Sequence, residues 1–142
     1  MNSLNDPNYL HKLSNSVDSV AKSAGLEILK IYNTEFEIER KDDESPLTEA
    51  DMNSHHVICN GLDELGLELP ILSEESAAID YAVRKDWQTY WLVDPLDGTR
   101  EFIKRNGEFT VNIALIHNQQ PIIGVVYVPI SGVSSLGVKQ VG

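Results

Sequence analysis

The sequence has little cysteine, little positive charge and no long hydrophobic run. Cys59 is the single cysteine among 142 residues, so an internal disulfide and a cysteine-rich zinc site are both excluded. The neighbours of Cys59 are apolar, which predicts a buried thiol. Internal repeats and low-complexity tracts are also missing, and the length suits one domain with its own hydrophobic core.

Positive charge is scarce throughout the chain. Lys and Arg number 11 against 22 Asp and Glu, which gives a formal net charge of -11. A nucleic-acid polymer needs Lys and Arg to neutralise its phosphates, so we exclude it as a partner. The basic group Arg100, Lys104 and Arg105 is a local exception. It is either solvated surface or a contact for a second phosphate on a small ligand.

Signals for membranes and secretion are also missing. No apolar run approaches the roughly 20 residues that are needed to span a bilayer. Residues 1–9 lack the charged and apolar regions of a signal peptide. We therefore expect a cytoplasmic protein without a transmembrane segment, and we leave peripheral contact with the inner membrane open.

The hydrophobic periodicity predicts long helices followed by an antiparallel sheet. Apolar residues at three- and four-residue steps indicate helices, which we expect over 7–33, 49–65 and 76–84. Short β-branched and alternating runs indicate strands, which we expect at 36–39, 70–73, 89–93, 109–116, 122–128 and from Val133 onward. The strands 109–116 and 122–128 are expected to form a hairpin, and residues 41–47 a loop.

The most informative motif is Asp94-Pro-Leu-Asp97-Gly-Thr99, which directly follows an apolar run. This pattern predicts a strand that ends at Asp94, and then a tight turn that carries Asp97 and Thr99. Two carboxylates held so close repel each other unless cations lie between them. Oxygen ligands on a rigid turn suit Mg²⁺. The pentad Asp-x-x-Asp-Gly alone is also common in surface turns.

Two upstream segments carry further acidic residues. In Pro70-Ile-Leu-Ser73-Glu74-Glu75, an apolar run again ends in carboxylates, and neighbouring strands would bring Glu74 to the edge that carries Asp94. For Glu75 a helix N-terminus capped by Ser73 is an equal alternative.

The third acidic element is Ser45-Pro-Leu-Thr48-Glu-Ala-Asp51. Thr48-x-x-Asp51 resembles a capping box, so Asp51 either satisfies a backbone N–H or also directs an oxygen into the site. We do not expect His55-His56 to bind zinc, because adjacent residues on a helix point in different directions.

In order, Ser45–Asp51, Leu72–Ser76 and Asp94–Thr99 resemble the first three signatures of the inositol monophosphatase superfamily, the lithium-sensitive and Mg²⁺-dependent phosphatases. The run from Tyr90 to Ile116 is more similar to the CysQ branch of that superfamily, the 3'(2'),5'-bisphosphate nucleotidases of sulfur metabolism. The resemblance extends from Leu10 to Val133.

The resemblance implies a metal centre of two or three Mg²⁺ ions. Glu74, Asp94 and the backbone carbonyl of Leu96 would hold the first ion. Asp94 would bridge to a second ion that Asp97 also binds, and a third ion would lie near Glu74.

The resemblance also implies the catalytic and substrate-binding residues. Asp51 and Thr99 would form a relay that orients and deprotonates the attacking water. Backbone N–H groups at a helix start would meet the phosphate. The implied substrate-binding residues are Glu74, Leu96, Asp97, Gly98 and Thr99.

The implied activity is removal of the 3' or 2' phosphate from adenosine 3',5'-bisphosphate, a small-molecule nucleotide, to give AMP and phosphate. The alternatives among enzymes are an inositol monophosphatase and a sugar bisphosphatase. The alternative from another class is a metal- or anion-binding fragment with weak catalysis or none.

The implied fold class is α+β, the N-terminal domain of the layered α-β-α-β-α sugar-phosphatase fold, with a mainly antiparallel sheet flanked by two long helices. Residues 1–142 would be the metal- and phosphate-binding domain, and the C-terminal domain of the family would be absent from this chain. The sheet edge left after Val138 would then be open to another chain, which predicts a homodimer or a swapped assembly.

Overall fold

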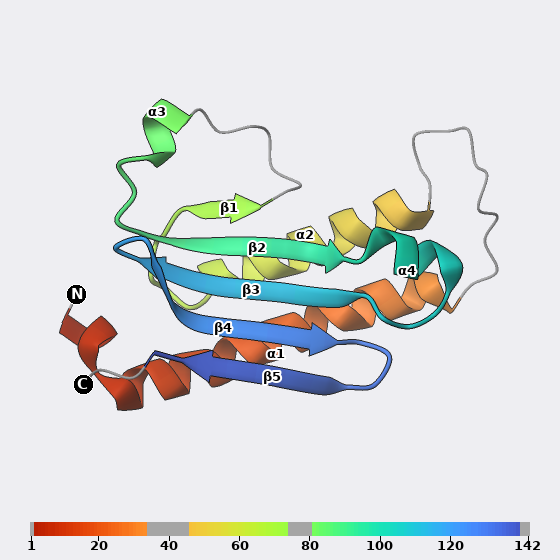
Figure 1. Ribbon diagram of the computed structural model, residues 1–142, viewed down its shortest axis with the longest axis horizontal. Coiled ribbons are helices and arrows are strands. Elements are labelled where there is room, and N and C mark those ends of the chain that lie inside the picture. Colours follow the sequence, from red (N-terminus) through yellow and green to blue (C-terminus); the bar gives the residue numbers. More distant parts are fainter. Residues whose placement is uncertain (1, 34–45, 74–80, 140–142) are drawn as a thin grey trace.

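The computed structural model describes residues 2–33, 46–73 and 81–139, which form helices packed on one five-stranded sheet (Figure 1). The elements are η1 (Asn2–Asn5), α1 (Pro7–Tyr32), α2 (Pro46–Asp63), β1 (Ile71–Ser73), α3 (Tyr81–Arg84), β2 (Thr89–Asp97), α4 (Thr99–Lys104), β3 (Thr110–His117), β4 (Gln120–Val128) and β5 (Val133–Val138). The α+β class, with two long helices and a mostly antiparallel sheet, is confirmed.

The strands lie in the sheet in chain order, β1-β2-β3-β4-β5. β1 runs parallel to β2, and every other neighbouring pair is antiparallel. The predicted hairpin is β3–β4, and its two-residue turn has positive φ at Asn118 (51°) and Gln119 (66°). Two positive φ angles match the right-handed twist of the flanking strands, which explains why so short a turn closes this hairpin.

The helix α1 starts where the sequence predicts. Asp6 caps it by accepting a hydrogen bond from the Asn8 backbone N–H at 3.0 Å, and Pro7 occupies the first helical position. Its apolar stripe is buried against β3, β4 and β5, while α2 packs against α1 and β2. A Cβ on Gly61 of α2 would lie 2.9 Å from the Val20 side chain, so glycine permits this close approach of the two helices.

Both long helices cover the same face of the sheet, behind the strands in Figure 1. Side chains that point toward the helices, such as Trp91 and Ile113, are fully buried. On the other face Leu92 and Val126 are 43% and 41% exposed. That face holds a shallow hollow of about 300 Å³, which Asp94 helps to line.

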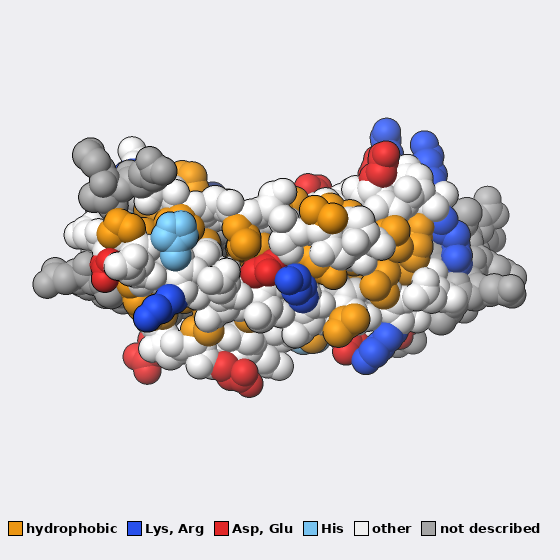
Figure 2. Space-filling model, turned by 90° about the horizontal axis from the view of Figure 1, so that it is seen from below, with side chains coloured by type: hydrophobic (Ala, Val, Ile, Leu, Met, Phe, Trp, Pro, Cys, Tyr) orange, Lys and Arg blue, Asp and Glu red, His pale blue; other side chains and the backbone are white. Residues whose placement is uncertain are grey.

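The strand β5 lies at one edge of the described sheet. Its sequence, VSSLGV, carries no charge, and Val133 and Leu136 are largely exposed. Figure 2 views the molecule from this side and shows hydrophobic side chains spread along it, interspersed with acidic and basic ones. The predicted pairing of this edge with another chain stays a prediction.

Some predicted boundaries are wrong. The helix α2 begins at Pro46 and not at residue 49, because proline is favoured at the first helical position. Thr48 therefore lies inside the helix, and the capping-box interpretation is wrong. The predicted strand 36–39, most of the loop 41–47 and residues 76–80 of a predicted helix lie outside the described residues. Among the helices that the structure describes, none is both long and apolar enough to cross a membrane.

Candidate metal centre

The strand β2 runs through both carboxylates of the Asp-x-x-Asp motif. Its last residue is Asp97, so the prediction that the strand ends at Asp94 and a tight turn follows is wrong. Asp94 pairs with Asn112 of β3, and Asp97 pairs with Thr110. Three steps along β2 therefore match two steps along β3, which means that β2 carries one extra residue, a β-bulge.

The bulge decides where the two carboxylates point. Side chains alternate between the faces of a regular strand, so residues three apart would lie on opposite faces. The extra residue removes this mismatch, and Asp94 and Asp97 share the face of their partners Asn112 and Thr110. It is the face that α1 and α2 leave uncovered. Asp94 is partly buried in the hollow there, and Asp97 is exposed.

Pro95 and Ser54 explain the position of the bulge. Pro95 has no N–H and cannot donate to the ladder, which favours an irregularity at this point. Its carbonyl oxygen accepts a hydrogen bond of 2.7 Å from the hydroxyl of Ser54, a fully buried residue of α2. The side chain of Leu96 is also buried, so this residue could reach a metal only through its carbonyl. The bulge is thus held from the helix side while the carboxylates face away.

Gly98 joins β2 to α4 in a conformation that requires glycine. Its φ is 94°, and an added Cβ would lie 3.2 Å from the Phe109 Cα. Three aromatic rings fix the position of α4, with centroids 4.9 to 5.5 Å apart: Tyr32, Phe102 and Phe109. The backbone of Gly98 and Thr99 is therefore held next to Asp97.

Asp51 lies on α2 three residues before Ser54, so the two share a face of the helix. The Oδ1 atom of Asp51 is buried. Thr99 is the exposed first residue of α4, and α4 packs against α2. Asp51 and Thr99 therefore lie on two helices, α2 and α4, which contact each other at the end of β2. The relay between them stays a prediction.

Glu74 and Glu75 lie outside the described residues. Ser73 is the last residue of β1, level with Val93, which immediately precedes Asp94. Asp94 and Asp97 are therefore two described members of a predicted larger ligand set, and the described residues hold no group of three His, Cys, Asp or Glu placed to bind an ion. The described donors on this face are the carboxylate oxygens of Asp94 and Asp97, and this chemistry fits a hard cation such as Mg²⁺.

A second polar cluster surrounds His55 on α2. Its Nδ1 lies 3.0 Å from the Ser73 hydroxyl, and its Nε2 lies 3.7 Å from the Cys59 sulfur. Burial raises the pKa of the Cys59 thiol, and the nearby charge of Asp63 raises it further. Cys59 is only partly buried, so the predicted burial of this thiol is wrong in degree.

The three residues of the basic group behave differently. The Arg105 guanidinium donates to the Tyr32 carbonyl oxygen at 3.2 Å and lies 5.8 Å from the centre of the Tyr32 ring. Arg105 therefore joins α4 to the end of α1. All three side chains of the basic group are exposed.

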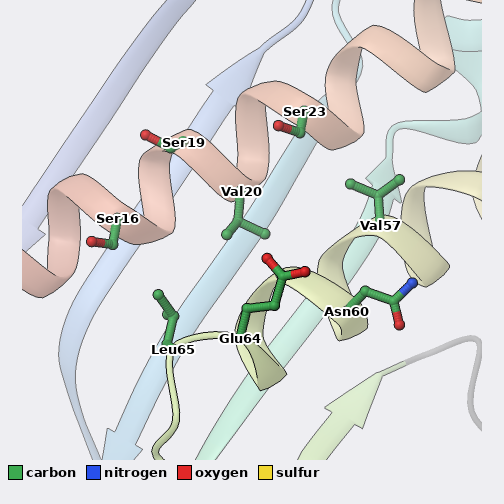
Figure 3. Close-up of a pocket in the computed structure, with 9 residues that line it drawn as sticks. Ser16, Ser19, Val20, Ser23, Val57, Asn60, Glu64 and Leu65 are labelled. Atoms are coloured by element: carbon green, nitrogen blue, oxygen red, sulfur yellow. The ribbon is translucent and has the colours of Figure 1, made fainter.

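A wider hollow of about 600 Å³ lies between α1 and α2. Figure 3 shows Ser16, Ser19 and Ser23 along α1, with Val20 pointing toward α2. The hydroxyls of Ser16 and Ser19 donate to carbonyls of their own helix. Glu64 is the one charged residue in this lining, which therefore suits neither a metal ion nor a phosphate.

Sequence reasoning missed Ser54, Thr110 and Asn112. The last two had a detectable signal, because polar residues alternate with Val111 and Ile113 at the start of an otherwise apolar strand. Such alternation places both polar side chains on one face. Ser54 carried no comparable signal.

The chain is similar to known proteins in both sequence and structure. The chain is 53% identical over 116 residues to the 3'(2'),5'-bisphosphate nucleotidase CysQ of Salmonella typhimurium, covering 80% of this chain and 47% of that protein. It is 52% identical over 119 residues to CysQ of Escherichia coli K12, covering 82% and 48%. The crystal structure of CysQ from Bacteroides thetaiotaomicron matches with a TM-score of 0.82 at 48% identity, covering 92% of this chain and 47% of that chain.

An inositol monophosphatase from Zymomonas mobilis matches with a TM-score of 0.76 at 27% identity, covering 92% of this chain and 49% of that chain. The chain spans about half the length of the curated relatives that it matches. Residues 10–142, nearly all of the chain, match the model of the inositol monophosphatase family. The chain belongs to the inositol monophosphatase family.

Proposed function

We propose that this chain is the metal- and phosphate-binding N-terminal part of a Mg²⁺-dependent 3'(2'),5'-bisphosphate nucleotidase. The observation that carries the proposal is the β-bulge, which places Asp94 and Asp97 on one face beside the Gly98–Thr99 turn. Relatives that bear the name of this activity are 52% and 53% identical to the chain, which favours a bisphosphate nucleotide over an inositol phosphate.

The residues that would hold Mg²⁺ are Asp94, Asp97, the carbonyl of Leu96 and Glu74, which follows Ser73 in the sequence. When bound, Mg²⁺ supplies positive charge for the phosphate oxygens and lowers the pKa of a water toward neutrality. The substrate is an anion and the chain carries a formal charge of -11, so their association requires such cations.

The protein's own groups then orient the phosphate and move one proton. The backbone N–H groups of Gly98 and Thr99 would donate to the phosphate. The α4 helix has only six residues, so these donors matter more than its dipole. Asp51 would accept the hydroxyl proton of Thr99, and the hydroxyl oxygen would accept a proton from the attacking water. In-line attack on the phosphorus would break its bond to the ribose oxygen, which would take up a proton from solvent water as it leaves, giving AMP and phosphate.

The test is phosphate release from adenosine 3',5'-bisphosphate, inositol 1-phosphate and fructose 1,6-bisphosphate, with Mg²⁺ and with EDTA. We expect Mg²⁺-dependent release from the adenosine substrate alone. Asp94→Asn should abolish it. Release that favours inositol 1-phosphate would contradict the proposed substrate. Metal binding that Asp94→Asn abolishes, without phosphate release from any substrate, would identify a binding fragment.

A further inference from the structure

Asn112 connects the two strands that carry the candidate metal centre. Its backbone pairs with Asp94, but its side chain reaches the next carboxylate along β2. The Nδ2 of Asn112 donates to the Oδ2 of Asp97 at 3.0 Å, and the hydroxyl of Thr110 donates to the Oδ1 of Asn112 at 2.9 Å. Asn112 and Thr110 are both partly buried on the face shared with the carboxylates.

These two hydrogen bonds determine the orientation of the amide. An ionised carboxylate can only accept, so the atom of Asn112 that faces Asp97 must be Nδ2. The Oδ1 atom must then face Thr110, whose hydroxyl can only act as the donor in this pair. Thr110, Asn112 and Asp97 thus form a chain in which each group has a defined role.

We infer that Asn112, oriented by Thr110, is a positioning residue that holds Oδ2 of Asp97 so that Oδ1 is directed to a divalent cation. This inference rests on the proposed function, in which Asp97 is a metal ligand. Partners that orient a metal-binding carboxylate affect metal affinity by about 10- to 100-fold when they are removed.

The Asn112 side chain is a neutral amide, so it can orient the Asp97 carboxylate without neutralising its charge. A Lys or Arg beside Asp97 would compete with a cation for the carboxylate, whereas a neutral amide orients it and leaves its charge in place. Two ion pairs join described residues to each other, Lys22–Asp18 and Lys30–Glu27, and both lie on α1 and leave Asp97 out.

The experiment measures the affinity of the full 142-residue chain for Mn²⁺, an ion that prefers the same oxygen ligands as Mg²⁺. The electron paramagnetic resonance signal reports the concentration of free Mn²⁺. We expect Asn112→Leu to weaken binding about 10-fold. Thr110→Val should weaken it by less, and Thr110→Ser, which keeps the hydroxyl, should restore it. Gln88→Leu is the matched control. It removes an amide hydrogen bond of 2.9 Å to Asn118 at the opposite end of β2, and it should leave affinity unchanged.

Asp97→Asn separates this inference from the proposed function. If Asp97→Asn weakens Mn²⁺ binding while Asn112→Leu binds like the unmodified chain, the positioning role is wrong and the metal site stands. If Asp97→Asn leaves binding unchanged, Asp97 does not bind the ion, and both the positioning role of Asn112 and the ligand role of Asp97 in the proposed function are wrong. Thermal unfolding monitors the fold of each variant. Should Asn112→Leu fail to fold, equal affinity of the valine and serine variants at Thr110 would overturn the inference.

Discussion

Asp94 and Asp97 lie on the same face of the sheet although they are three positions apart along β2. In a regular strand this odd spacing would point them in opposite directions. The candidate metal centre therefore depends on a feature of the backbone, the β-bulge, as much as on the two acidic side chains. The contact that holds the bulge is on the helix side, where the Ser54 hydroxyl reaches the Pro95 carbonyl.

Ser54→Ala should lower the free energy of unfolding by about 1–3 kcal/mol, because it leaves a buried carbonyl without its donor. Mn²⁺ affinity should fall with it, because the bulge then has more conformational freedom. Urea unfolding followed by circular dichroism measures the first effect. Ser19→Ala is the matched control. That hydroxyl is exposed and donates to the Asn15 carbonyl of its own helix, so stability should change by less than about 0.5 kcal/mol. Equal stability of the two variants would show that the Ser54 contact is unimportant.

Gly98→Ala should be more destabilising than Gly132→Ala, although both residues have positive φ, 94° and 74°. The left-handed conformation costs alanine about 1–2 kcal/mol at either position. At Gly132 no atom lies within 4 Å of the added Cβ, whereas at Gly98 the Phe109 Cα lies 3.2 Å away and cannot move independently of β3. Thermal unfolding of both variants measures the difference. A Gly98 variant no less stable than the Gly132 variant would contradict the close approach.

The helices and strands were largely predictable because each depends on a local pattern. The apolar stripe of α1 and the Asp6-Pro7 start specify that helix without reference to the rest of the chain. The start of α2 is not predictable from the sequence, because Pro46 can either end a loop or begin a helix. Tertiary packing determines which of these two roles Pro46 has, and the periodicity of the sequence contains no information about that packing.

The candidate site was only partly predictable. The acidic motif identified Asp94 and Asp97, but Pro95 and Gly98 also suggested that the strand ends early. Pairing with β3 carries the strand on to Asp97, and the position of a bulge depends on the partner strand. Asn112 lies 15 residues beyond Asp97 in sequence, so no local sequence pattern predicts their hydrogen bond. The bond depends on how β2 and β3 pair. The metal and catalytic roles of these residues remain predictions.

Arg105→Ala should lower stability by about 0.5–1 kcal/mol, because it removes a donor to the Tyr32 carbonyl and a cation–π contact. Arg100→Ala is the control, since Arg100 is exposed on the same short helix and its loss should change stability by less than about 0.5 kcal/mol. Thermal unfolding at matched pH and salt compares them. If the two variants are equally stable, Arg105 does not join α4 to α1.

Asp63→Asn should make the Cys59 thiol more reactive at alkaline pH. Burial and then the charge of Asp63 raise the pKa of this thiol above its ordinary value of 9.0. Only the thiolate reacts with iodoacetamide, so removing the Asp63 charge should shift the pH dependence of alkylation downward. The chain has a single cysteine, which makes the measurement unambiguous. Glu64→Gln is the control, because its charge does not contribute to the shift, and an equal response of both variants would contradict the assignment to Asp63.

The same shift predicts how stability depends on pH. The folded thiol keeps its proton to a higher pH than the unfolded thiol, so above the unfolded pKa the folded state binds more protons. The slope of the unfolding free energy against pH is then negative. The contribution of Cys59 is fully present below the unfolded pKa and is lost as pH rises through the folded pKa. In Asp63→Asn the unfolding free energy should fall less steeply with rising pH. Urea unfolding at a series of alkaline pH values measures this slope. A steeper loss in Asp63→Asn than in the unmodified chain would reverse the sign and contradict the effect assigned to Asp63.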